Sequence, residues 1–317
     1  MSPKMSRRQC LEVLGKTGAM LPLMGTAPFF EKMKTASHNR DIHIFSKHLQ
    51  WLDYGKMART AAEIGFDGVD LTVRPKGHVL PENVEVDLPK AVEAIRKAGL
   101  KAELLTTAIT DANAPHTETI LKTASRLGIK TYRMGWLDYA DGKPIPEQLE
   151  VFKKQLAELA EMNKHYGLHG AYQNHAGDSV GASLWDTWFI IKDLDPTYLG
   201  ARFDVRHAVV EGMHSWETSL KLLAPHIRSL DLKDFIWTQK DGKWTVENVP
   251  VGQGAVDFGR YFQLLDELKI DAPITLHLEY PLGGANDGAY DITVPPEVVK
   301  DAMRADLTSL KKIMNDK

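Results

Sequence analysis

From residue 41 onward the chain repeats one pattern of hydrophobic and polar positions. An apolar residue recurs every three to four positions, a glycine follows, and a short apolar run comes next, as in AAEIGFDGVDL, ASRLGIKTYRMGW and NKHYGLHGAYQNH. The first spacing is typical of an amphipathic helix, and the short run is typical of a buried strand. The glycine falls where helices commonly end in a left-handed residue. The pattern therefore predicts helices and strands in alternation.

The repeats predict eight strands with helices between them. The strands are expected near residues 41–46, 67–73, 101–107, 130–135, 169–174, 199–204, 226–232 and 273–279. Strands that alternate with helices form parallel sheets, and eight such units indicate an α/β fold with a single (β/α)8 TIM barrel. The sequence contains no GxGxxG or P-loop pattern, which disfavours an open nucleotide-binding sheet. We expect one barrel domain over residues 39–317.

Residues 1–38 have a different pattern. Two adjacent arginines precede an apolar stretch that is shorter than the roughly twenty residues of a membrane helix and is interrupted by Glu12 and Lys16. The order SRRQCL resembles a twin-arginine (Tat) signal, with Cys10 where that signal usually has phenylalanine. We expect a signal peptide and linker here, with export by the Tat translocase to the periplasm. A cytosolic amphipathic helix is the alternative.

Composition and charge narrow the class of partner. The 317 residues are 43% hydrophobic and 26% charged, as in ordinary globular proteins. The formal net charge of −3 provides no basic field, so the chain is not expected to bind nucleic acid. The single cysteine excludes an intramolecular disulfide. The composition leaves formation of a homo-oligomer open.

Polar residues gather where the predicted strands end. In a TIM barrel, the C-terminal ends of the strands face the active site. The strand ends carry Asp70, Arg74 and His78; Arg133, Trp136 and Tyr139; Gln173, Asn174 and His175; Asp204 and His207; Asp231, Lys233 and Asp234; His277 and Glu279. We expect one polar site at this end of the barrel.

Three carboxylates at successive strand ends predict a cation. Asp204, Asp231 and Glu279 would repel one another strongly at close range unless a cation or a proton joined them. With the amide oxygen of Gln173 the predicted ligand set is all oxygen, which favours Mn²⁺ or Mg²⁺ over Zn²⁺. The alternative for any one carboxylate is an ion pair with Arg202, Arg206 or Lys233.

The same strand ends carry candidates for catalysis. His175 and His207 follow two of the predicted ligands, and an imidazole suits proton transfer at neutral pH. Lys233 is a candidate to hold an enolate, and Glu279 is a further candidate base. The alternatives are that the histidines cap loops or support the site from behind, and that the lysine is a surface residue.

Substrate binding is predicted at four neighbouring positions. Trp136 is placed to stack on a sugar ring, and Arg74, His78 and Asn174 are expected at the same end of the barrel. In the stretch AYQNHAG, we expect Gln173 to hold the metal or the substrate while His175 faces the reacting carbon.

The motifs YQNHAG, FDVRHA, LDLKDF, VGQGAVDF and LHLEY resemble the xylose isomerase-like TIM-barrel superfamily, which includes sugar phosphate isomerases and epimerases and AP endonucleases. The resemblance extends over the chain after residue 40. In that family the fifth strand commonly reads Glu-Asn-His and its Glu binds the metal; Gln173 stands at that position. The seventh commonly reads His-x-Lys-Asp and its His is a ligand; Asp231 stands there. Asp204 and Glu279 match the family ligands.

The resemblance implies a metal-dependent isomerase or epimerase that transfers a proton next to a sugar carbonyl, with a small carbohydrate as substrate. The first alternative is a lyase or hydrolase of 3-keto-glycosides, which uses the same enolate chemistry. An AP endonuclease is disfavoured by the acidic net charge. A non-catalytic sugar-binding barrel is the remaining alternative, because Gln173 replaces an acid.

Overall fold

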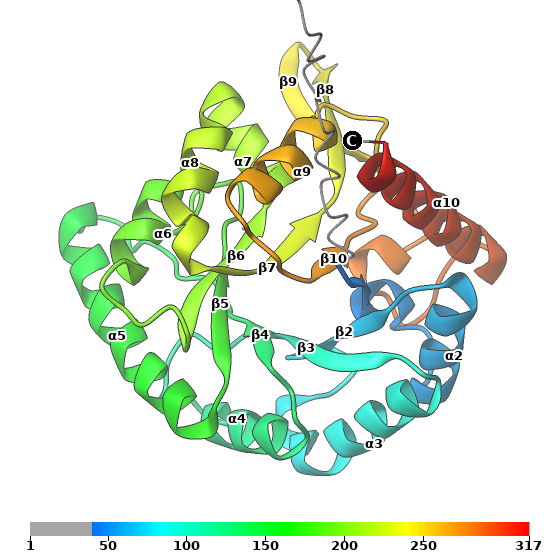
Figure 1. The fold of residues 1–317 in the computed structure, drawn as a ribbon, viewed down its shortest axis with the longest axis horizontal. Coiled ribbons are helices and arrows are strands. Elements are labelled where there is room, and N and C mark those ends of the chain that lie inside the picture. The colour runs from blue at the N-terminus through cyan, green and yellow to red at the C-terminus, as the bar shows by residue number, and fades with distance from the viewer. Residues whose placement is uncertain (1–39, 317) are drawn as a thin grey trace, which may run out of the picture. The chain divides into compact units, whose positions relative to one another are not determined.

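The computed structural model describes residues 40–316, in which eight parallel strands close into a barrel (Figure 1). Each strand overlaps one of the eight predicted strands, which confirms the single (β/α)8 barrel. The strands, in order around the barrel, are β1 (Ile42–Phe45), β2 (Gly68–Val73), β3 (Lys101–Thr107), β4 (Thr131–Arg133), β5 (His169–Gln173), β6 (Leu199–Asp204), β7 (Ile227–Leu232) and β10 (Ile274–Leu276). The predicted signal peptide, with Cys10, lies outside the described residues.

Helices surround the barrel on its outside (Figure 1). The α-helices are α2 (Tyr54–Ile64), α3 (Val84–Lys97), α4 (Thr117–Arg126), α5 (Ile145–Tyr166), α6 (Leu184–Ile191), α7 (Val205–Gly212), α8 (Trp216–Leu223), α9 (Phe258–Glu267) and α10 (Pro296–Asn315). Short 3₁₀ turns are η1 (Ser46–Leu49), η2 (Pro81–Asn83), η3 (Met213–Ser215), η4 (Ala224–His226) and η5 (Ala285–Asp287). As the repeat predicts, α2 and α5 end at Gly65 and Gly167, whose φ angles are 100° and 67°.

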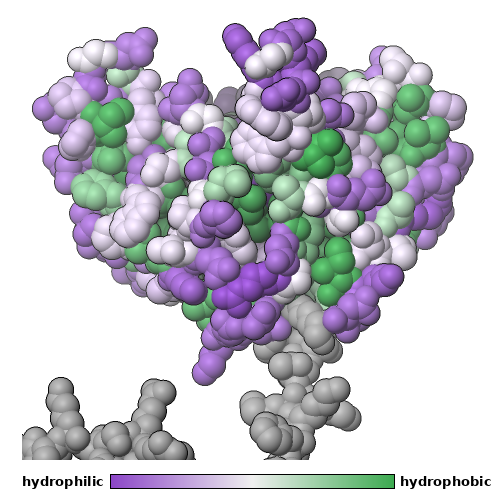
Figure 2. All heavy atoms as spheres, turned by 90° about the horizontal axis from the view of Figure 1, so that it is seen from above, coloured by the Kyte–Doolittle hydropathy of each residue, from purple (hydrophilic) through white to green (hydrophobic). Residues whose placement is uncertain are grey.

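The apolar faces of the helices pack on the outer faces of the strands to form the core. Ile44, Leu71, Leu230 and Leu276 are fully buried or nearly so, as expected for parallel strands covered on both sides. On the surface shown in Figure 2, hydrophobic residues lie in small separate patches among hydrophilic ones. In the described part of the chain, no helix combines the length and the apolar character needed to cross a membrane.

A β-hairpin after β7 is absent from the sequence prediction, which placed only a helical pattern there. Strands β8 (Asp234–Lys240) and β9 (Lys243–Val249) pair antiparallel outside the barrel. Asp241 and Gly242 form the turn with φ angles of 52° and 74°, and residues of alternating polarity flank them. An Asp-Gly pair in that setting is a strong hairpin signal, so the sequence did contain the information.

Candidate active site

The C-terminal ends of the strands surround a cavity of about 50 Å³. The cavity is lined by Phe45, Lys47, Arg74, Arg133, Trp136, Gln173, His175, Lys233, His277 and Glu279. A larger hollow of about 300 Å³ lies where the strands begin, with Asp41, His43 and Lys130 in its wall. Catalytic residues of TIM barrels come from the opposite end, so the smaller cavity is the candidate active site.

Inside the barrel, the buried side chain of Arg202 forms ion pairs with the carboxylates of Asp231 and Asp70. The Nε atom of Arg202, on β6, lies 2.7 Å from each carboxylate oxygen of Asp231, and its Nη2 atom lies 2.6 Å from Oδ2 of Asp70. Arg202 is only 1% exposed, so pairing offsets the cost of burying its charge. Burial opposes the ionisation of Asp231, but Arg202 and His277 beside it hold its pKa below the usual range. The charge of Asp231 is therefore balanced within the protein.

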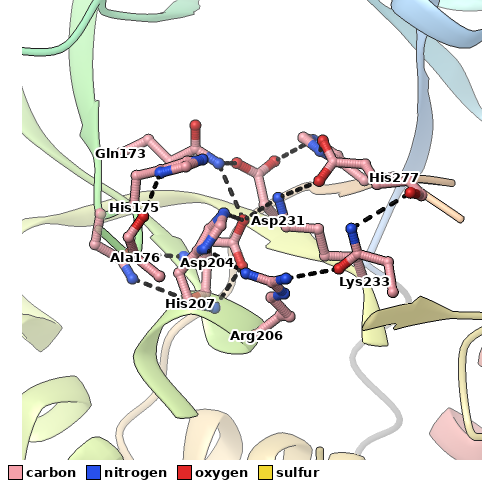
Figure 3. Close-up of polar contacts among 12 residues, drawn as sticks. Gln173, His175, Ala176, Asp204, Arg206, His207, Asp231, Lys233 and His277 are labelled. Atoms are coloured by element: carbon pink, nitrogen blue, oxygen red, sulfur yellow. Dashed lines mark hydrogen bonds and ion pairs between the residues drawn. The ribbon is translucent and has the colours of Figure 1, made fainter. Parts of the chain in front are cut away.

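The ammonium group of Lys233 lies between the carboxylates of Asp204 and Glu279. The Nζ atom of Lys233 is 3.3 Å from Oδ2 of Asp204 and 2.9 Å from Oε2 of Glu279. Lys47, after β1, contacts the second oxygen of Glu279 at 3.0 Å. Burial by itself lowers the pKa of Lys233, but Asp204 and Glu279 raise it above the usual value. Figure 3 shows Asp204 and Asp231 between Gln173 on one side and Lys233 and His277 on the other.

The amide of Gln173 completes this network. Its Nε2 atom donates to Oδ2 of Asp204 at 3.1 Å and to Oδ2 of Asp231 at 2.6 Å, and its Oε1 atom accepts from Nη1 of Arg133 at 2.8 Å. The amide nitrogen therefore faces the acids, while the oxygen faces a guanidinium. A glutamate would place a third carboxylate against Asp204 and Asp231, which explains the neutral residue here.

The four predicted metal ligands come together, but the arrangement does not fit a divalent ion. These are Gln173, Asp204, Asp231 and Glu279. Lys233 is already between two of them, Arg202 neutralises the third, and the amide oxygen of the fourth contacts Arg133. Among residues 40–316, no group of three or more His, Cys, Asp or Glu side chains has the arrangement to hold a metal ion. In this structure the four side chains form a network with basic side chains, and the expected Mn²⁺ or Mg²⁺ site stays a prediction.

His175 lines the cavity in a defined tautomer. Its Nδ1 atom lies 2.8 Å from the carbonyl oxygen of Ala176, which can only accept, so Nδ1 carries the proton and Nε2 has the lone pair. Its ring contacts Trp136 edge-on, with 4.8 Å between centroids. Burial, and then the charge of Lys233, lowers the pKa of His175 below its usual value, so the ring is neutral at pH 7.

His207 lies behind His175 and does not line the cavity. The two ring centroids are 4.0 Å apart. The Nδ1 atom of His207 accepts from Arg206 at 3.0 Å, which places the proton on Nε2, 3.6 Å from Oδ2 of Asp204. Burial holds the pKa of His207 well below its usual value. The structure therefore places His207 as a support for His175, the alternative that the sequence left open.

The four predicted substrate-binding residues divide into two pairs. Arg74 and Trp136 line the cavity. His78 does not, because its ring nitrogens face Ser46 and the carbonyl oxygen of Leu49, each at 3.2 Å.

Asn174 also lies outside the cavity wall. Its side chain donates to the carbonyl oxygen of Asp204 at 3.0 Å and accepts from the amide of Asp204 at 2.8 Å, which joins β5 to β6. Its contacts are therefore structural, like those of His78.

Some residues of the cavity wall were given no binding or catalytic role from the sequence. Lys47 lies just after β1, a strand end for which the sequence pattern predicted no site residue. Arg133 ends β4 and lies 4.4 Å from the ring centroid of Trp136. His277 follows β10, stacks on Phe45 with 4.5 Å between centroids and donates from Nε2 to Asp231 at 3.1 Å. The position of Arg133 and His277 at strand ends was the available signal.

The fold and the site define a TIM barrel with a polar cavity at the C-terminal ends of its strands. The family model described as xylose isomerase-like TIM barrel matches residues 58–305, so the chain belongs to this family. A search of curated proteins finds no match.

Solved structures share the fold at low sequence identity. D-allulose 3-epimerase from Methylomonas sp. is 14% identical, with a TM-score of 0.63 over 86% of this chain and 98% of that one. 3-Keto-D-glucoside 4-epimerase from E. coli is 14% identical, with a TM-score of 0.62 over 86% and 99% of the two chains. A probable 3-DHS dehydratase from Bacillus anthracis is 14% identical, with a TM-score of 0.63 over 86% and 98%. At this identity the likeness shows the fold alone.

Proposed function

We propose that the protein is a carbohydrate-acting isomerase or epimerase that moves a proton on the carbon next to a sugar carbonyl. The observation that carries the proposal is the neutral His175, whose Nε2 lone pair has no hydrogen-bond partner among the described residues. The family membership supports this class of reaction, and two structural neighbours are named as sugar 3- or 4-epimerases.

His175 is the proposed base. Its Nε2 atom takes the proton from the carbon next to the carbonyl, and the electron pair of the broken C–H bond forms a carbon–carbon double bond while the carbonyl oxygen becomes an enolate. For isomerisation, the hydroxyl group on the carbon that lost its proton gives its own proton to the enolate oxygen, and the proton on His175 goes to the former carbonyl carbon, so the carbonyl group moves by one position. For epimerisation, the same carbon takes a proton from solvent on its opposite face, and His175 releases its proton to solvent. The hydrogen bond from Nδ1 to Ala176 keeps the ring in the required tautomer.

Lys233 is the proposed source of positive charge for the enolate. It is 2% exposed and fixed by Asp204 and Glu279, so its charge is held in place before the reaction starts. The ammonium group of Lys233 would stabilise the negative charge on the enolate oxygen, the role that the sequence assigned to a divalent ion. If the enolate instead expelled a leaving group from the next carbon, the reaction would be that of a 3-keto-glycoside lyase. This is the second candidate function, because a 3-keto-glucoside enzyme is among the structural neighbours.

Hydrogen exchange with solvent tests the proposal without knowledge of the product. The protein, treated with EDTA, is incubated in D₂O with D-fructose, D-allulose, methyl 3-keto-glucoside or D-glucuronate, and loss of the C–H signal next to the carbonyl is followed by NMR. We expect exchange with at least one sugar and a loss of about 10²–10⁴-fold in His175→Gln. His165→Gln, an exposed histidine on α5, is the matched control. Equal exchange in both variants, with both folded, would remove His175 from the mechanism.

A further inference from the structure

Arg74 faces the cavity without an acidic partner. It follows β2, and no hydrogen bond or ion pair of its side chain occurs among the described residues. Its guanidinium carbon lies over the ring of Phe45, 5.6 Å from the ring centroid. Asp70 and Glu279 act on it only at longer range. Its hydrogen-bond donors are therefore available to a ligand.

Arg133 is a second cation without an acidic partner. It is 4% exposed, and its Nη atoms contact only neutral acceptors, the Oε1 atom of Gln173 at 2.8 Å and the carbonyl oxygen of Thr107 at 3.4 Å. Its Nε atom is buried without any partner, as is Nε1 of the neighbouring Trp136. A buried guanidinium without a counter-ion is costly, and a negatively charged ligand would offset that cost.

The wall of the cavity is strongly basic. Four of its five charged side chains are cations, namely Lys47, Arg74, Arg133 and Lys233, and the only acid is Glu279. Lys47 and Lys233 both contact Glu279, while the two arginines have no such contact. Together with Arg202 and the acids Asp70, Asp204 and Asp231 behind the wall, the charged groups leave an excess of one positive charge at the cavity.

From this excess we infer that the substrate is a sugar acid, whose carboxylate binds at Arg74 and Arg133. The inference rests on the proposed function, because Lys233 is assigned to the enolate and the carboxylate is the charge that the two arginines bind. Lys47, Arg74, Arg133, Arg202 and Lys233 face the four acids Asp70, Asp204, Asp231 and Glu279, so one carboxylate offsets the single excess positive charge. A phosphate dianion carries more negative charge than this single excess positive charge can offset. A guanidinium also presents its donors in the planar geometry that a carboxylate accepts.

Binding to the protein tests this inference separately from catalysis. EDTA-treated protein is titrated by calorimetry with D-glucuronate, D-glucose and D-glucose 6-phosphate. Hydrogen bonds to charged groups are worth enough to give D-glucuronate an advantage of roughly 10- to 100-fold over D-glucose. In Arg74→Gln this advantage disappears while D-glucose binding changes less than about twofold, and Arg74→Lys restores part of it.

Arg304→Gln is the matched control, because Arg304 is exposed on α10 and its loss changes the net charge equally. Equal affinity for D-glucuronate and D-glucose in the unchanged protein would overturn the inference, as would tighter binding of D-glucose 6-phosphate. If the Arg74-dependent preference is found but no sugar exchanges hydrogen, the binding site stands and the proposed function fails. If a sugar exchanges hydrogen but the preference is missing, the proposed function stands and the sugar-acid site fails.

Discussion

The three histidines around the cavity differ in what their ring nitrogens contact. His207 uses Nδ1 to accept from Arg206 and directs Nε2 toward Asp204, and His277 donates from Nε2 to Asp231. His175 uses only Nδ1, whereas the Nδ1 atom of His277 makes no hydrogen bond but lies 3.6 Å from Oε1 of Glu279. At the scale of single residues, the choice of base therefore depends on hydrogen-bond partners more than on position in the sequence, where His175 and His207 are equivalent.

The pKa of His175 predicts the acid limb of the pH profile. Burial and Lys233 lower the pKa below 6.5, and the neutral form is the base. The acid limb of kcat/KM should therefore have its midpoint below pH 6.5. Initial rates between pH 4.5 and 9 check this. An acid limb with a midpoint above pH 7 would mean that another group is the base.

Gln173→Glu should destabilise the fold, and more so at high pH. The change removes two N–H donors and places a carboxylate against Asp204 and Asp231. We expect a loss of about 2–4 kcal/mol in the free energy of unfolding at pH 8. The loss shrinks toward pH 5, because the crowded carboxyl has a raised pKa and binds a proton in the folded state.

Urea unfolding at both pH values measures this effect, with the exposed Gln253→Glu as control. A variant as stable as the unchanged protein at pH 8, or one that gains a tightly bound Mn²⁺, would show that the centre accepts a metal after all.

The sequence predicts which acids meet but not their partners. A carboxylate at a strand end is visible in the pattern, whereas its neighbour across the barrel depends on strand register. The sequence left open an ion pair with Arg202, Arg206 or Lys233 for each acid. In the structure, Arg202 contacts Asp231 and Lys233 contacts Asp204 and Glu279. Arg206 instead binds His207 and Asn248.

At the scale of elements, the segment after β7 is organised by one aspartate. The carboxylate of Asp234 accepts from the amides of Gly252 and Gly254 on Oδ2, at 3.0 and 2.9 Å, and from Phe235 and Val256 on Oδ1. A side chain at Gly254 would overlap with Asp234 and with the backbone at Phe235. This fixes the loop that follows the hairpin next to Lys233.

Asp234→Asn tests the importance of that loop. An amide has one acceptor atom, so its nitrogen would face the two glycine amides and leave both without a partner. We expect the free energy of unfolding to fall by about 2–4 kcal/mol. Thermal and urea unfolding measure it, and Asp241→Asn in the exposed hairpin turn should be nearly neutral because Asn tolerates a positive φ. Equal stability of the two variants would contradict this account of the loop.

At the scale of the whole molecule, repetition made the barrel predictable. Eight similar units each give a helix, a turn and a strand, and the closed sheet follows from their number. The hairpin β8–β9 was missed because it interrupts this repeat, although its Asp-Gly turn is present. The sequence predicted Arg74 and Lys233 as site residues but assigned no role to Lys47 or Arg133, which come from other units and join them only when the barrel closes.

We propose that residues before the barrel direct export through the Tat translocase to the periplasm. The arginine pair and the short apolar stretch support this proposal. In its native host the mature chain should begin between Gly25 and Ser37. N-terminal mass spectrometry of the protein from each cell fraction checks this prediction, and a cytosolic chain that retains its first 24 residues would contradict it.

The most direct test of the central claim is the rate of C–H exchange by protein freed of metal. The protein is prepared without a histidine tag, its metal content is measured by mass spectrometry, and exchange is compared after EDTA and after addition of Mn²⁺ or Mg²⁺. The account predicts the full rate without metal and a decrease of about 10²–10³-fold in Lys233→Met, which loses the charge and is unbranched but one atom shorter. One bound metal ion per chain, with exchange abolished by EDTA and restored by Mn²⁺, would contradict it.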